Sequence, residues 1–187
     1  MRVHSALKGS VVKKLIVIMV LLAAGIIYFY NTNWFQSSFI GSFYDPIAVV
    51  PLDVTKKGER ISIPLKYEYE TCYDLGVKVP GRELFVSRKT GKGLLKYKFV
   101  SDWNVVAEGV THPTNSRRWD VGDEMSVPLL LVFDLPFPGA ANNLMLELEV
   151  VEAFSYLEEY KGQTSIIISP NYEPKVGKCY NENLRIE

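Results

Sequence analysis

The sequence has few of the residues that metal binding or histidine-dependent catalysis requires. Its 187 residues include two cysteines and two histidines, and His112 is the only histidine beyond the N-terminal apolar segment. A tetrahedral zinc site takes about four Cys, His or acidic ligands, and Ser-His-Asp or Cys-His catalysis needs a histidine beside the nucleophile. The motifs G-x-S-x-G, H-E-x-x-H, the EF-hand loop and the N-glycosylation sequon are also absent. We therefore predict no metal, no cofactor and no enzymatic activity; His112, before a proline in a polar stretch, is expected to be structural or solvated.

Acidic residues are absent from the first 44 residues, and no charge of either sign lies between Lys14 and Asp45. The run from Leu15 to Tyr30 is apolar apart from its terminal aromatics. Sixteen helical residues cover about 24 Å of a hydrocarbon core about 30 Å thick, and Val11 and Val12 extend the run toward that length. Residues 11–30 are therefore predicted to span a lipid bilayer.

The segment before this helix is basic and has no acid. By the positive-inside rule, residues 1–10 form a cytoplasmic tail of a protein in a bacterial plasma membrane, and the C-terminal part is periplasmic or extracellular. The alternative is a cleaved signal peptide. Ala23-Ala24-Gly25 offers small residues to a peptidase, but bulky apolar residues continue beyond them, which favours an uncleaved anchor.

Beyond the helix we expect a short uncharged stalk, residues 31–44, and one domain, residues 45–187, of a size suited to a single core. Four of the 21 basic residues precede the apolar run that starts at Leu15, which leaves 21 − 4 = 17 basic residues after it. All 21 acidic residues also follow this run, so the exported part has a net charge of −4. Nucleic-acid binding favours the opposite sign, so we predict no nucleic-acid partner. The other expected partner, besides the bilayer, is an envelope or exported protein.

Two cysteines in an exported domain usually form a disulfide, so we predict a Cys72–Cys179 bridge, with two free thiols as the alternative. Period-two alternation from Ile61 to Val79 predicts a half-buried strand bent near residues 71–74, with Pro64 at a sheet edge and Cys72 on the outward face. Further strands are expected at residues 47–54, 95–99, 127–135, 144–150 and 166–168.

About seven or eight strands with short turns and no second helix pattern indicate an all-β fold, an immunoglobulin-like antiparallel β-sandwich. The immunoglobulin Cys–Trp–Cys spacing is not met. Residues 103–122 are predicted to be an irregular loop, which is where binding residues tend to lie, although an ordinary connection is equally compatible.

Residues 82–98 are basic, and residues 147–159 are acidic. The glycines near Lys92 favour a hairpin turn, because the spacing and following helix of a phosphate loop are missing. Oppositely charged patches would steer a charged partner, whereas each alone is compatible with a solvated strand face. The candidate partner-binding residues are Arg82, Arg88, Lys89, Lys92, Arg117, Arg118 and Trp119.

The segments Val50-Pro51-Leu52-Asp53-Val54, Ile61-Ser62-Ile63-Pro64-Leu65, Tyr73-Asp74-Leu75 and Ser126-Val127-Pro128-Leu129 carry a resemblance. The chain resembles small bacterial membrane-anchored or exported β-sandwich proteins of unknown function, some of them immunity proteins of secreted toxins. The resemblance implies toxin neutralisation in the periplasm and no active site. We expect a protein-binding module at the membrane face; the alternative is a structural or assembly component of an envelope complex.

Overall fold

The computed structural model describes residues 3–111, 116–120, 122–135, 143–172 and 179, with side chains from residue 12 onward. The chain divides into two compact units, residues 1–41 and residues 42–187. The expectation for His112 lies outside the described residues.

The first unit consists of two helices, α1 (Val3–Tyr30) and α2 (Asn33–Phe39). The part of α1 from Val12 to Tyr30 has a mean hydropathy of 2.3 and none of it is buried, so by length and composition it could cross a membrane. Thr32 begins α2, and its hydroxyl accepts a hydrogen bond from the Phe35 N–H at 3.3 Å. The predicted stalk therefore contains a second helix, which corrects the prediction that the chain has only one.

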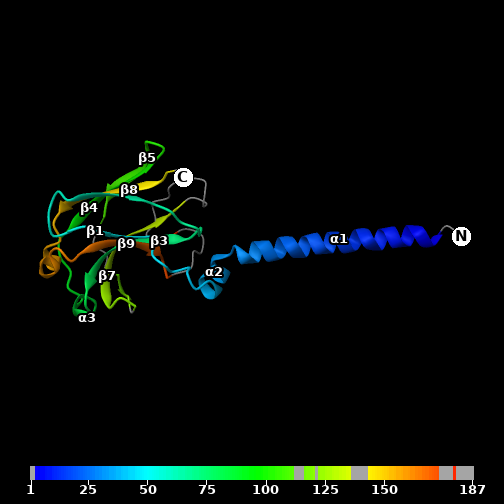
Figure 1. Ribbon diagram of the computed structural model, residues 1–187, viewed down its shortest axis with the longest axis horizontal. Coiled ribbons are helices and arrows are strands. Elements are labelled where there is room, and N and C mark those ends of the chain that lie inside the picture. The colour runs from blue at the N-terminus through cyan, green and yellow to red at the C-terminus, as the bar shows by residue number, and fades with distance from the viewer. Residues whose placement is uncertain (1–2, 112–115, 121, 136–142, 173–178, 180–187) are drawn as a thin grey trace. The chain divides into compact units, whose positions relative to one another are not determined.

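The second unit is a sandwich of two antiparallel sheets, as predicted (Figure 1). One sheet has five strands in the order β1 (Ala48–Pro51), β9 (Ser165–Pro170), β3 (Cys72–Pro80), β7 (Met125–Asp134) and β6 (Arg117–Asp120). The other has four, in the order β2 (Arg60–Pro64), β8 (Met145–Glu152), β4 (Leu94–Ser101) and β5 (Asn104–Val110).

The strands pair in a nested order. β1 pairs with β9, β2 with β8, β3 with β7, and β4 with β5, all antiparallel. The four pairs therefore resemble one long hairpin wound around the core. The pairs β1–β9 and β3–β7 lie in the five-stranded sheet, and β2–β8 and β4–β5 lie in the four-stranded one. The innermost pair, β4 and β5, is a local hairpin, and β6 also pairs with the β7 that follows it; the outermost pair joins Ala48 to Ile168.

The core lies between the two sheets. The side chains of Tyr73, Leu75, Val77 and Val79 alternate along β3 and are all buried in it, as the period-two pattern predicted. The Phe133 ring joins the layers, with its centroid 6.2 Å from that of Tyr73 in its own sheet and 5.1 Å from that of Phe99 in β4. The opposite face of β3 is buried too, which a half-exposed strand would not show.

Several predicted elements are wrong in detail. The alternation from Ile61 to Val79 belongs to two strands in different sheets, β2 and β3, because the chain crosses between the layers at residues 65–71. Pro64 does lie in an edge strand. Residues 103–122, expected to be irregular, include β5 and β6. Two short helical turns were not expected, α3 (Glu83–Ser87) and the 3₁₀ helix η1 (Ser155–Tyr160).

Candidate binding surface around α3

The helix α3 is held against the five-stranded sheet by one buried side chain and one serine. Leu84 is buried in the core. Ser126, at the start of β7, accepts a hydrogen bond from the Phe85 N–H at 3.2 Å and donates its own hydroxyl to the Gly81 carbonyl at 2.6 Å. Gly81 has φ +78°, a conformation that favours glycine, so the turn before α3 is set by the sequence. These contacts leave the rest of the helix facing solvent.

Arg117 of β6 ties the end of α3 to the sheet. Its Nη1 donates to the Leu84 carbonyl at 3.2 Å, and its Nη2 donates to the Lys89 carbonyl. A cation at the carbonyl end of a helical turn is favourable, because those carbonyls have no partner within the helix. The Arg117 Nε is buried and has no hydrogen-bond acceptor among the described residues. The guanidinium is therefore fixed in place but not fully satisfied.

Aromatic and cationic side chains adjoin this tie. The Phe85 and Trp119 ring centroids are 6.3 Å apart, and the Arg82 guanidinium carbon lies 6.0 Å from the Trp119 ring centroid. The second separation is at the outer limit of a cation–π contact. Arg82, Arg117 and Trp119, predicted as binding residues from two separate stretches, are therefore brought together at α3.

A hollow of about 670 Å³ opens at this place, lined by Phe85, Val86, Arg88, Thr90 and Arg117. Val86 is 65% exposed although it is apolar, and Arg88 ends the helix with a left-handed φ of 51°. The sequence analysis named the two arginines but missed Phe85 and Val86. In the sequence these two residues form an apolar pair within a basic segment. Such a pair is typical of a strand, and its exposure becomes evident only once the helical turn is known.

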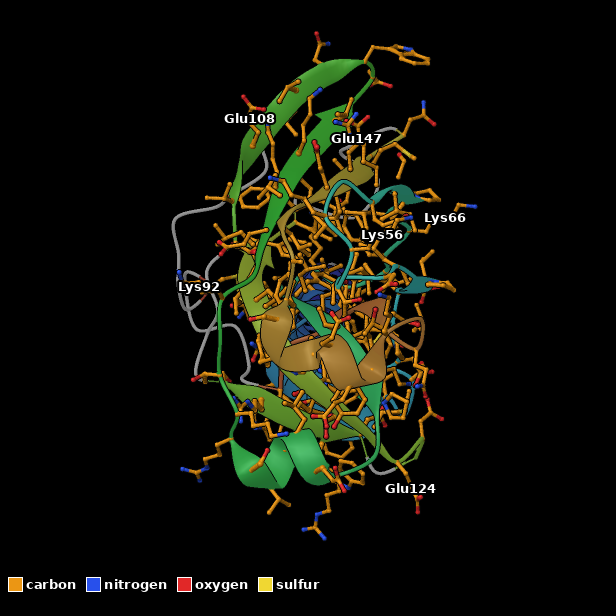
Figure 2. The ribbon with its side chains drawn as sticks, turned by 90° about the vertical axis from the view of Figure 1, so that its left-hand side faces the viewer. Lys56, Lys66, Lys92, Glu108, Glu124 and Glu147 are labelled. Atoms are coloured by element: carbon orange, nitrogen blue, oxygen red, sulfur yellow. A yellow bond between two sulfur atoms is a disulfide. The ribbon has the colours of Figure 1, made fainter. Side chains whose placement is uncertain are left out.

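Lys89 and Lys92, the remaining predicted residues of this segment, are both exposed. Lys89 forms an ion pair, and Lys92 forms none with a described residue. The Lys89 Nζ lies 3.1 Å from Glu159 Oε1, and that hydrogen bond raises the pKa of the lysine. Lys92 lies on the opposite side of the domain from Lys66 in Figure 2. The charge of Lys89 is thus largely met within the chain.

The expected separation into a basic and an acidic patch is wrong, because strand pairing interleaves the two segments. β4 and β8 are neighbours, so Lys98 of the basic segment lies opposite Glu147 of the acidic one, with 3.7 Å between Nζ and Oε2. The Arg60 Nη2 lies 2.8 Å from Glu149 Oε1. These pairs line a shallow groove of about 400 Å³ on the outer face of the four-stranded sheet. Glu108 of β5 lies beside this groove, with its Oε2 3.6 Å from the Nζ of Lys96, and Figure 2 shows Glu108 and Glu147 toward the same end of the domain.

Arg118 is directed away from α3, as alternation along a strand requires. Its Nη2 donates to Ser169 Oγ at 2.7 Å, its Nη1 lies 3.8 Å from the buried Asp74 carboxylate, and its guanidinium carbon lies 5.1 Å from the Tyr172 ring centroid. These contacts give Arg118 a structural role on the outer face of the five-stranded sheet. The structure therefore separates it from the other predicted binding residues.

The predicted disulfide is present: Cys72 and Cys179 are bonded, with Cα atoms 5.4 Å apart. Both cysteines are buried with Val132 in a small cluster distinct from the main core. Cys72 therefore lies on the outward face of β3, as its position in the alternation predicted. Within the described parts of the chain, no group of three or more His, Cys, Asp or Glu side chains could hold a metal ion.

No protein-family model and no curated protein matches this chain. A solved structure of a protein from Sulfurospirillum deleyianum is similar to it, with a TM-score of 0.45 and 14% sequence identity. The likeness covers 68% of this chain and 98% of the other. A likeness of this degree assigns neither a family nor a function.

Proposed function

We propose that this protein is a membrane-anchored binding module whose α3 surface takes up a segment of another protein. The observation that carries the proposal is the hollow beside α3, where the exposed Val86 and the ring of Phe85 adjoin Arg88 and Arg117. Interface cores are enriched in aromatic and arginine side chains, so this combination suits a partner segment with apolar and acidic residues. The role is one of binding and not of catalysis.

We propose in addition that α1 anchors the chain in a bacterial plasma membrane, with its N-terminus in the cytoplasm and the sandwich outside. The apolar stretch of α1 supports the anchor, and the basic residues before it support the orientation. Neutralisation of a toxin in the periplasm fits such a module, because an anchored binder meets its target where the target enters.

For the fold class, the nested strand pairing supports a jelly roll in preference to the immunoglobulin-like topology. In an immunoglobulin sandwich the first two strands are neighbours in one sheet. Here β1 to β4 alternate between the sheets, and the chain folds as one wound hairpin. Double-sheet jelly rolls are a common all-β architecture that also serves in binding proteins such as lectins.

The test is site-specific photo-crosslinking in cells that express the full chain, with the crosslinking amino acid at Val86. A matched control carries it at Val49, which is also apolar and about half exposed but lies on β1. We expect one stoichiometric crosslinked product from position 86 and none from position 49. Arg88→Glu with Lys92→Glu should abolish it, whereas Lys57→Glu with Lys66→Glu, which makes the same change in net charge at two exposed lysines outside the α3 surface, should not.

The identity of the product then decides between the two functions. A secreted toxic enzyme, with loss of protection in the Arg88→Glu, Lys92→Glu variant, supports neutralisation. A resident envelope protein supports the alternative of an assembly component. A product that persists after charge reversal, or none at all, overturns the α3 surface as the binding site.

A further inference from the structure

We propose that α2 is an interfacial helix that lies in the headgroup layer of the membrane, with its aromatic side directed into the lipid. The inference rests on the proposed anchoring by α1 and extends it. The partner is the lipid surface itself, and the residues that meet it are Trp34, Phe35 and Phe39.

The first argument is the distribution of side chains around α2. At about 100° per residue, Trp34, Phe35 and Phe39 fall within a sector of about 140°. On the opposite side lie the polar residues Asn33, Gln36 and Ser37, whereas the small, uncharged Ser38 falls within the aromatic sector. Trp34 and Phe39 are 57% and 65% exposed, so more than half of each of these two side chains is left uncovered by the described chain. An uncharged helix with one aromatic side suits the boundary between water and lipid.

The second argument is continuity with the membrane-spanning stretch. The rings of α2 contact those at the end of α1: the Phe29 centroid lies 5.6 Å from Trp34 and 5.3 Å from Phe35, and the Tyr30 centroid lies 5.3 Å from Phe35. Within α2, Phe35 and Phe39 stack at 4.9 Å. The cluster begins where the span ends, which is the depth at which tryptophan and tyrosine accumulate.

The third argument is that the polar side chains at the corner between the helices have hydrogen-bond partners within the corner. The Asn31 side chain donates to the Ile27 carbonyl at 2.8 Å, and the Thr32 hydroxyl donates to the Phe29 carbonyl at 2.7 Å. The same hydroxyl caps α2. Near hydrocarbon, an unpaired polar group costs several kcal/mol, so a corner whose polar side chains are paired locally is the kind that tolerates this depth.

The experiment reconstitutes the full chain into phosphatidylcholine vesicles and measures quenching by lipids labelled with nitroxide at the headgroup or along the acyl chain. The Trp103→Phe, Trp119→Phe variant leaves Trp34 as the single tryptophan; the Trp34→Phe, Trp119→Phe variant leaves Trp103, which is 97% exposed. We expect Trp34 emission to be blue-shifted and to be quenched most strongly by the headgroup and upper acyl labels. The fluorescence of Trp103 should not be quenched in this way. Added phosphatidylglycerol should not change the result, because α2 has no charge.

Vesicle flotation in the same samples separates the two proposals. If the chain floats with the vesicles but Trp34 is quenched no more than Trp103, the anchor stands and the interfacial helix is overturned. If the chain does not float, the anchoring by α1 fails, and the inference fails with it.

Discussion

At the scale of single residues, Gly93 shows how closely the core approaches the backbone. A Cβ atom at this position would lie 2.4 Å from the ring of the buried Phe154. Real Cβ contacts do not approach so closely, and the ring is enclosed by the core. Glycine is thus required here by packing and not by a turn, although the sequence suggested a turn.

We predict that Gly93→Ala lowers the free energy of unfolding by about 1–3 kcal/mol, the usual cost of overpacking a filled core. The control is Gly122→Ala, where the added Cβ would meet nothing closer than Asp120 Oδ1 at 3.8 Å. Urea unfolding of the full chain in detergent measures both. Equal stabilities for the two variants would contradict the close contact with Phe154.

Asp53 and Thr55 form a small hydrogen-bonded turn after β1. The Thr55 hydroxyl donates to Asp53 Oδ1 at 2.6 Å, and the Thr55 N–H donates to the same oxygen at 3.1 Å. The hydroxyl bond is the main cause that lowers the pKa of Asp53. A carboxyl group with a lowered folded-state pKa stabilises the fold above its unfolded pKa, and this stabilisation is lost as the pH falls through the folded-state pKa.

We therefore expect Thr55→Val to be less stable than the wild type at neutral pH, with a difference that shrinks as the pH falls below about 4, where unfolded aspartate protonates. Thr55→Ser keeps the hydroxyl and should keep the pH dependence. Denaturation midpoints of the three proteins between pH 3 and pH 7 provide the measurement. A difference between Thr55→Val and the wild type that is constant with pH would show that the hydroxyl acts on stability independently of the charge of Asp53.

At the scale of elements, the β4–β5 hairpin carries an unusual turn. Ser101 pairs with Asn104, so Asp102 and Trp103 are the two turn residues, with φ of +46° and +70°. Two positive values define a type I′ turn, in which the second position strongly favours glycine. A tryptophan there is strained, and it is almost fully exposed, so it gains no burial in return.

We predict that Trp103→Gly raises the free energy of unfolding by about 1 kcal/mol, because glycine adopts the left-handed conformation without steric cost. Trp103→Ala keeps the Cβ and should give no comparable gain. Thermal unfolding of both variants tests this. Destabilisation by the glycine would mean that the tryptophan ring makes stabilising contacts that outweigh the strain.

The long, alternating elements were predictable from the sequence, and the short ones were not. β7 and β8 follow from runs of alternating or continuous apolar residues that few other structures accommodate. The five residues of α3 make little more than one helical turn, so their periodicity cannot be told from that of a strand. The sequence predicted a bend where β2 and β3 are in fact separate strands. Alternation alone does not show that the chain passes from one sheet to the other.

The candidate site was predictable in part for a related reason. Composition identified Arg82, Arg117 and Trp119, but only the pairing of β6 with β7 and the packing of α3 bring them together. Conversely, the basic and acidic segments do exist in the sequence, but they do not form separate surface patches. Their strands β4 and β8 are neighbours, so the opposite charges are interleaved. Pairing between distant strands depends on the whole fold, and no local pattern encodes it.

At the scale of the whole molecule, the Cys72–Cys179 disulfide closes a loop of 107 residues. On the loop-entropy account such a bridge stabilises the fold by about 4–5 kcal/mol. We predict a loss of this size, seen as a lower denaturation midpoint, in the Cys72→Ala, Cys179→Ala variant. Wild type treated with reductant should match the variant, and a variant as stable as the oxidised wild type would contradict the prediction.

The proposed anchoring by α1 has its own test at this scale. One arginine near the centre of a spanning helix costs about 2.5–3.5 kcal/mol of insertion free energy. We expect Leu21→Arg with Leu22→Arg to release the chain from membranes washed with alkaline carbonate, and Leu21→Ile with Leu22→Ile to leave it bound. The wild-type chain should keep its full mass of 21.2 kDa. A shortened and soluble product would indicate cleavage as a signal peptide, and a soluble product of full mass would contradict anchoring.

The nested strand order also determines when the β-sandwich can finish folding, because its first strand pairs with its last. The partners of the outermost pair, Ala48 and Ile168, are 168 − 48 = 120 residues apart. At about 5–20 residues per second, β1 leaves the ribosome roughly 6–24 s before β9 does. During that interval β1 has no partner strand and Cys72 has no Cys179 to oxidise with. The sandwich is therefore completed only after β9 has emerged, and its early strands need protection from aggregation until then.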